Sequence, residues 1–175
     1  MMAMAQHYDA FISYNSRDRA QVETIIEWLE QKRGLRLYYD RRAGMPGHLW
    51  VRELGEALDG SQAAVVCVGP QGFSTWQQRE ICYALERHGR DDAFRVIPVM
   101  LPGSEPPLSM LKLYTWVDFR LGAIDEGYLG VLAAAIAGEP PGLEAQRAAH
   151  DLRERANPSR LARLPRRRRG IFLWS

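Results

Sequence analysis

The chain has 175 residues, of which 46% are hydrophobic and 25% are charged. This composition suits a globular domain with its own core, and it excludes a wholly disordered chain, a collagen-like chain and a disulfide scaffold. The formal charge of +2 conceals two unlike parts, because residues 1–138 carry a net charge of −3 and residues 139–175 a net charge of +5. We therefore expect an acidic body followed by a basic extension.

The two cysteines, Cys67 and Cys82, both lie in apolar runs. Neither belongs to a CxxC pair or has histidines nearby at metal-ligand spacing, so we expect two buried thiols in a reducing compartment and no metal site. The first residues lack the basic flank and apolar run of a signal peptide, and no apolar run approaches the roughly 18 residues of a membrane helix. These features predict a cytoplasmic location.

Short apolar runs of strand length alternate along the chain with longer amphipathic runs. The predicted strands cover residues 8–14, 35–39, 63–68, 94–100 and 114–119. The predicted helices cover residues 18–32, 49–58, 74–88 and 125–137. This alternation predicts an α/β fold with three flavodoxin-like layers: a five-stranded parallel sheet in the order 2-1-3-4-5 with helices on both faces.

Local signals place the ends of these elements. Asp18 with Gln21, and Ser74 with Gln77, have the spacing of capping boxes at the starts of two helices. Gly34 is expected to end the first helix. Pro98 interrupts the fourth strand and predicts an outer position for it in the sheet.

The character of the chain changes after residue 138. A short charged helix over residues 143–156 would lack a defined apolar face, and prolines at 158 and 165 break the chain before the arginine run 166–169. We interpret residues 139–175 as a linker or basic extension. Because no aromatic residues are interleaved with the arginines, the run favours a solvated segment over a nucleic-acid or membrane partner.

In an open sheet of this kind, ligands bind beyond the carboxyl ends of the strands, where the strand order reverses. That crevice lies between the first and third strands and is bordered by residues 13–18 and 69–75, with residues 40–50 able to fold over its mouth. Glu80 lies in the second turn of the helix that begins there, four residues after Trp76 and therefore on the same face. We expect its carboxylate to be partly desolvated and to face the crevice.

Two common classes with this architecture do not fit the residues at the site. A phosphoacceptor receiver domain needs an aspartate at the end of the third strand and a lysine after the fifth, where this chain has Val68-Gly69-Pro70 and Arg120. A nucleotide-binding Rossmann domain needs a glycine-rich turn after the first strand, where this chain has Ser13-Tyr14-Asn15-Ser16.

Four motifs occur in order and at fitting distances, namely YDAFISYNSRD (8–18), YDRRAGMPG (39–47), STWQQRE (74–80) and YTWVDFR (114–120). Together they resemble a Toll/interleukin-1 receptor (TIR) domain of the bacterial, NAD-cleaving kind. The resemblance covers residues 7–138 and leaves residues 139–175 outside it. One departure is Val68-Gly69-Pro70, where the family often carries Ser-Pro.

The resemblance implies a catalytic role for Glu80, because many TIR domains with a glutamate at this position resemble enzymes that cleave NAD⁺ at the nicotinamide–ribose bond. One carboxylate suits this chemistry, since the leaving group is already a cationic pyridinium and needs no general acid, whereas an ordinary glycosidase uses two carboxyl groups. A helical glutamate that only pairs with neighbouring polar side chains is the structural alternative. No cofactor is implied beyond NAD⁺ as the substrate.

Further residues are expected to bind the substrate. Trp50 and Tyr14 are candidates to stack on nicotinamide or adenine, with ordinary packing as the alternative, whereas Trp76 is expected to pack against the sheet. The remaining candidates lie in the loops around the crevice: Ser13, Arg17, Asp40, Gly44, Pro46 and Gly47.

In this family the loop after the second strand lies over the nucleotide and docks on the next subunit, so the resemblance implies activity on self-assembly. It suggests an effector of bacterial defence or signalling that works with itself or with another sensor chain or domain. The product is either linear ADP-ribose or a cyclic isomer. The alternative function is a non-catalytic TIR adaptor that acts only through TIR–TIR contacts.

Overall fold

The computed structural model describes residues 7–39, 50–105, 116–120, 124–143, 146–147 and 150, without the side chains of residues 50–53. Five parallel strands form one sheet in the order β2-β1-β3-β4-β5, which confirms the predicted fold class. The strands are β1 (Ala10–Ser13), β2 (Leu37–Tyr39), β3 (Ala63–Val68), β4 (Arg95–Met100) and β5 (Val117–Asp118).

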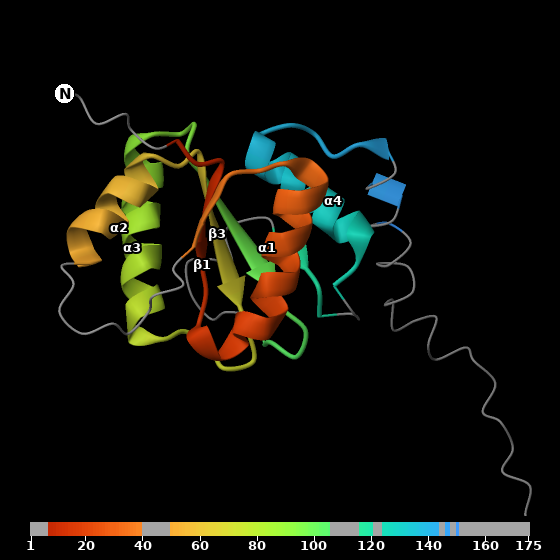
Figure 1. Ribbon diagram of the computed structural model, residues 1–175, viewed down its shortest axis with the longest axis horizontal. Helices are drawn as coiled ribbons and strands as arrows, with labels where there is room; N and C mark the ends of the chain where they lie inside the picture. The colour runs from red at the N-terminus through yellow and green to blue at the C-terminus, as the bar shows by residue number, and fades with distance from the viewer. Residues whose placement is uncertain are drawn as a thin grey trace, which may run out of the picture.

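Helices cover both faces of this sheet, as the sequence predicts (Figure 1). They are α1 (Arg19–Arg33), α2 (Trp50–Asp59), α3 (Thr75–Arg90) and α4 (Glu126–Ala137), with a 3₁₀ turn, η1 (Ser16–Asp18), before α1. The pair α2 and α3 lies on one side of the strands, and the pair α1 and α4 lies on the other.

Alternation along the strands divides the apolar residues between two cores. On β1, Ala10 and Ile12 pack with α1 and α4, whereas Phe11 packs with α2 and α3. All six residues of the central strand β3 are buried, as expected for a strand covered on both faces. The same alternation determines which side of the sheet each residue at the carboxyl ends faces.

Of the three predicted helix-end signals, Gly34 acts as expected, the Ser74 capping box forms only through the Ser74 hydroxyl, and the Asp18 box does not form. Gly34 ends α1 at φ 64°, and the Ser74 hydroxyl accepts a hydrogen bond from the Gln77 N–H at 3.1 Å. The predicted capping box of Asp18 with Gln21 is wrong, because the Asp18 side chain makes no cap hydrogen bond at the start of α1. Instead, the 3₁₀ turn η1 precedes α1, and the Asn15 side chain caps this turn by accepting from the Arg17 N–H at 3.1 Å.

The outer position predicted from Pro98 is also wrong, since β4 lies between β3 and β5. The Met100 carbonyl accepts from the Phe119 N–H on the β5 side, and alternate residues of a strand face the same neighbour. Pro98 therefore faces β5 as well, but in the described part of the chain β5 pairs only with Val99 and Met100. The missing N–H of the proline thus costs no hydrogen bond of the described ladder.

The two cysteines differ in exposure, which corrects the prediction that both are buried. Cys67 on β3 is buried, and its burial raises the pKa of the thiol to about 12, with the negative charge of Asp18 adding to the rise. Cys82 on α3 is exposed, since it follows the inward-facing Ile81 and so lies about 100° further round the helix. Within the described residues, no helix has the length and apolar character needed to cross a membrane.

Candidate functional site

The central contact of the site joins Ser13 at the end of β1 to Glu80 on α3. Ser13 lies two residues after Phe11, so it faces the same side of the sheet, toward α2 and α3. Its hydroxyl donates a hydrogen bond to Glu80 Oε2 at 2.5 Å. Only 2% of Ser13 and 5% of Glu80 is exposed, so this carboxylate is more deeply buried than the sequence predicts.

A hydroxyl that donates to a carboxylate makes a charge-assisted hydrogen bond, which favours the ionised form of the acid, whereas burial of the group opposes ionisation. Because water is largely excluded, a charge held here acts on its neighbours more strongly than it would at the surface. Ser13 also fixes the direction of one carboxylate oxygen. The pair therefore provides an oriented carboxyl group between β1 and β3, where the strand order reverses.

The loops after β1 and β3 lie side by side, as the strand order requires. The Asn15 side-chain amide donates to the Gly72 carbonyl at 3.1 Å and ties the two loops together. A second link runs from the Gln71 backbone N–H to the Asp18 carboxylate. Burial of Asp18 raises the pKa of its carboxyl group, and this backbone hydrogen bond opposes the rise.

Gly69 occupies the place where the family often carries serine, and the structure gives a steric reason. A Cβ atom at residue 69 would lie 2.0 Å from Asp18 Oδ2 and 2.2 Å from the carboxyl carbon. Asp18 is itself buried, with 5% of its surface exposed. A side chain at residue 69 would displace the carboxyl group, so glycine is required while Asp18 keeps this position.

Gln77 is a member of the site that the sequence assigns only to helix capping. Its side chain does not return to Ser74 but points inward, where Nε2 donates to the Cys67 carbonyl at 2.7 Å and to the Ser13 carbonyl at 3.4 Å. The residue is completely buried. One signal could have revealed it: Gln77, Ile81 and Ala84 follow each other at i, i+4 and i+7 on the inward face of α3, and the first of them is polar.

The other predicted substrate-binding residues are distributed unevenly. Trp76 is partly buried against the α2/α3 core, on the side of Glu80, whereas Tyr14 packs against the α1/α4 core on the opposite side of the sheet. Arg17 is exposed in the middle of the 3₁₀ turn. Five predictions lie outside the described residues or side chains: Asp40, Gly44, Pro46, Gly47 and the side chain of Trp50.

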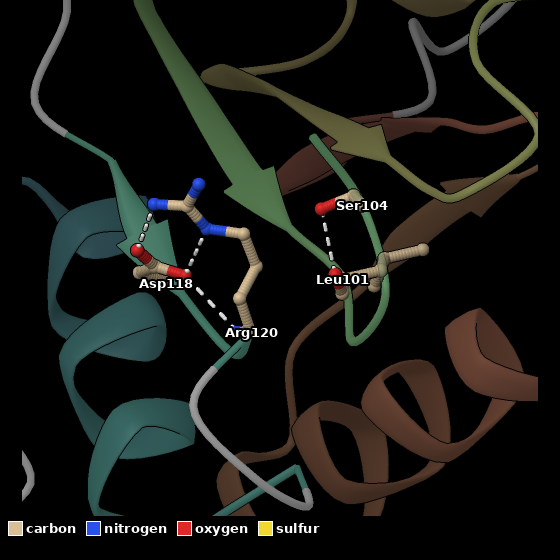
Figure 2. A network of polar contacts seen from close by, with 4 residues as sticks. All are labelled: Leu101, Ser104, Asp118 and Arg120. Atoms are coloured by element: carbon tan, nitrogen blue, oxygen red, sulfur yellow. Dashed lines mark hydrogen bonds and ion pairs between the residues drawn. The ribbon is translucent and has the colours of Figure 1, made fainter. Parts of the chain in front are cut away.

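At the carboxyl ends of β4 and β5, polar groups are satisfied by near neighbours (Figure 2). Arg120 folds back onto Asp118 with Nε–Oδ1 and Nη2–Oδ2 distances of 2.9 and 2.6 Å, and this hydrogen bonding raises the pKa of the guanidinium. The Ser104 hydroxyl donates to the Leu101 carbonyl at 2.6 Å. Across the described parts of the chain, no three His, Cys, Asp or Glu side chains come together as a metal site would require.

The fold and the buried carboxylate define an α/β domain of flavodoxin-like topology with its polar site at the β1/β3 switch point. The family model described as "TIR domain" matches residues 10–133. The chain belongs to the TIR domain family. A comparison with curated protein sequences found no match.

Solved TIR structures share the fold. The TIR domain of the Toll-related receptor TRR-2 from Hydra magnipapillata is 21% identical with a TM-score of 0.52, covering 64% of this chain and 84% of that one. A metazoan TIR-STING receptor from C. gigas is 22% identical with a TM-score of 0.57, covering 81% of this chain but only 44% of that one. The RPS4 and RRS1 TIR domain heterodimer is 12% identical with a TM-score of 0.56, covering 74% of this chain and 95% of that one.

Proposed function

We propose that this TIR domain is an NAD⁺ nucleosidase that cleaves the bond between nicotinamide and ribose, releasing nicotinamide and either ADP-ribose or its cyclic isomer. The observation that carries the proposal is the buried Glu80 carboxylate, which accepts the Ser13 hydroxyl at 2.5 Å at the switch point of a TIR fold. A carboxylate at this position is what the resemblance to NAD-cleaving TIR domains requires.

The geometry suits a reaction in which positive charge develops on the substrate. As the glycosidic bond breaks, nicotinamide leaves as a neutral molecule and the ribosyl group gains oxocarbenium character. Glu80, held by Ser13 and shielded from water, would stabilise that charge and orient the ribose hydroxyls. Water, or a nitrogen of the adenine, then captures the ribosyl cation and gives the linear or the cyclic product.

Activity is proposed to depend on self-association. The loop that would cover the nucleotide and dock on the next subunit includes Asp40, Gly44, Pro46 and Gly47, which lie outside the described residues. Association between TIR domains is known from the RPS4 and RRS1 heterodimer, and we extend it here to copies of this chain or to a separate sensor chain. We place the enzyme in the cytoplasm of a bacterium, as an effector of defence or signalling.

The test is release of nicotinamide from NAD⁺ by the purified chain over a series of protein concentrations, with products separated by chromatography. We expect the specific activity to rise with concentration, and Glu80→Gln to lower kcat by at least about a hundredfold, the usual effect of removing one preorganised electrostatic group. Glu86→Gln is the matched control, because the Glu86 side chain on the same helix is 67% exposed.

A folded wild-type protein that releases no nicotinamide at any concentration would sink the proposal. Equal activity in Glu80→Gln and Glu86→Gln would leave the reaction standing but remove Glu80 from it. If the folded chain binds another TIR domain but cleaves nothing, the non-catalytic adaptor becomes the function.

A further inference from the structure

Gln77 occupies an unusual place for an amide side chain. It is completely buried on α3, and its single Nε2 atom reaches the main-chain carbonyls of two different strands. One carbonyl belongs to Ser13, the last residue of β1, and the other to Cys67, next to the end of β3. The amide thus joins a helix to both strands that border the proposed active site.

The need for a donor at this point follows from the end of the β1–β3 ladder. The last paired residues are Ser13 and Val66, after which the chain leaves the sheet through the 3₁₀ turn η1. The Cys67 carbonyl lies one residue beyond that pair and no longer faces an N–H group of a continuing neighbour strand, and the Ser13 carbonyl lies at the point where β1 ends. The two protons of the Gln77 nitrogen serve both carbonyls, and only the nitrogen end of the amide can face two acceptors.

Gln77 and Glu80 then hold the same residue of β1 from two directions. They lie three residues apart, on neighbouring turns of one face of α3. Gln77 contacts the Ser13 carbonyl, and Glu80 accepts the Ser13 hydroxyl at 2.5 Å. A shift of the β1 end away from α3 would therefore move the hydroxyl out of reach of the carboxylate.

The remaining atom of the amide argues against a purely stabilising role. Among the described residues, no donor reaches Gln77 Oε1, although this oxygen is buried. A buried acceptor without a donor costs stability, so this oxygen offsets part of what the two hydrogen bonds of Nε2 contribute. Deviations of this kind are typical of functional sites.

We propose that Gln77 is a positioning residue, which fixes the carboxyl end of β1 so that Ser13 can orient the catalytic carboxylate of Glu80. The inference rests on the proposed NAD⁺ cleavage. Gln77 itself does not touch the reacting atoms and acts only through Ser13.

The test replaces the amide by an apolar side chain of equal length, Gln77→Met, with Gln78→Met as the control at the exposed neighbouring position. We expect Gln77→Met to lower kcat by about tenfold or more while KM for NAD⁺ changes less than about twofold, because a group acting on the transition state alone affects kcat. Because the Ser13 and Cys67 carbonyls lose their donor in Gln77→Met, the melting temperature should fall, and kcat is therefore compared per folded molecule. Unchanged kcat in Gln77→Met would overturn the inference.

A double-mutant cycle separates positioning from general structural damage. If Gln77 acts through Ser13, then adding Gln77→Met to Ser13→Ala should lower kcat by less than about twofold further, because coupled residues are not additive. Independent losses that multiply in the double variant would overturn the inference. Should no Gln77 variant fold, Ser13→Ala alone decides, since full kcat without the hydroxyl leaves nothing for Gln77 to position.

The crystal structure of Gln77→Met tests the inference separately from the reaction. The Ser13 Oγ to Glu80 Oε2 distance should lengthen beyond about 3.5 Å, outside hydrogen-bond range. If the pair stays bonded in the variant, the positioning role is wrong whether or not the protein cleaves NAD⁺. If the pair separates but the wild type releases no nicotinamide, the proposed function fails and the geometric role of Gln77 stands.

Discussion

Arg95 at the amino end of the parallel sheet and two polar side chains at its carboxyl end differ in how fully they are hydrogen-bonded. At the amino end, Arg95 of β4 donates to the Ala135 and Ile136 carbonyls in the last turn of α4, at 3.1 and 2.5 Å, and to the Ala93 carbonyl at 3.1 Å. At the carboxyl end, Asp18 and Gln77 each bury an oxygen that no donor reaches within the described residues.

The difference separates stabilising from functional use of polar groups. The last turn of α4 has no basic residue of its own, so Arg95 supplies the cation and the donors that a helix C-terminus favours. The carboxyl end instead retains buried acceptors and a buried Glu80 at a cost in free energy. We infer that Arg95 at the amino end stabilises the fold, whereas Asp18, Gln77 and Glu80 at the carboxyl ends of β1 and β3 serve the proposed site.

Removing the cap at the amino end should have the largest effect on stability. Arg95→Met loses three hydrogen bonds from a charged donor, and we expect the free energy of unfolding to fall by about 3 kcal/mol, since such bonds contribute about 1.5–3 kcal/mol each but are not additive. Urea unfolding measures this change. Arg90→Met is the control, because the Arg90 side chain is 64% exposed and lies 4.0 Å from Glu86.

The same two variants test whether the two ends of the sheet act separately. Arg90→Met should change the free energy of unfolding by less than about 1 kcal/mol, as exposed ion pairs usually do. Arg95→Met should keep its NAD⁺ cleavage per folded molecule, because it lies at the end of the sheet opposite Glu80. A selective loss of kcat in folded Arg95→Met would mean that the two ends are not separate in function.

At the carboxyl end, Gly69→Ala should destabilise the fold by about 2 kcal/mol, within the range for overpacking a filled site. The new methyl group would lie 2.0 Å from Asp18 Oδ2 and must displace it. The loss should largely disappear in the Asp18→Ala background, where the carboxyl group is absent. Thermal denaturation of the single and double variants measures this coupling.

The control for this substitution is Gly89→Ala on α3, where an added Cβ would meet nothing within 4 Å. It should be neutral or stabilising by up to about 1 kcal/mol, because alanine is the better helix former. If Gly69→Ala behaves like Gly89→Ala, the close packing of Asp18 on residue 69 is wrong.

The fold could be predicted because its signals are local and repeated. Apolar runs of strand length alternate with amphipathic helices, and the run over Ala63–Val68 is buried at all six positions, as a central strand requires. The prediction from Pro98 was wrong because a proline shows only that one backbone N–H group is missing. It does not show which neighbouring strand that position faces, or whether the strand offers an acceptor there. That depends on β5, whose described pairing reaches only Val99 and Met100.

The site could be predicted only in part, because its contacts are long-range. Glu80 follows from the motif, but the side chain of Gln77 does not, since its spacing from Ser74 suits a helix cap equally well. The acceptors that hold it inward are the carbonyls of Cys67 on β3, at 2.7 Å, and of Ser13 on β1, at 3.4 Å, and the second is 64 residues away in the chain. The side of the sheet that Tyr14 faces could not be predicted either. It depends on where β1 ends, and in the structure Tyr14 packs against the α1/α4 core.

The smallest predicted effect concerns the pH dependence that Asp18 adds at the carboxyl end. Burial raises the pKa of this carboxyl above its ordinary value of 3.8, so the folded state binds a proton more readily than the unfolded state. The stability that Asp18 contributes is then complete below pH 3.8 and is lost as the pH rises through the folded pKa. Asp18→Asn removes the buried charge and keeps an oxygen to accept from the Gln71 N–H.

We therefore expect Asp18→Asn to melt at a higher temperature than the wild type at neutral pH, with the difference shrinking as the pH falls toward 3.8. Asp92→Asn, at an exposed position, removes the same charge and should follow the wild type throughout. A lower melting temperature for Asp18→Asn at neutral pH would show that the ionised carboxylate stabilises the fold. Asp18 would then resemble Arg95 in being a stabilising charge, and the contrast between the two ends of the sheet would rest on Glu80 and Gln77 alone.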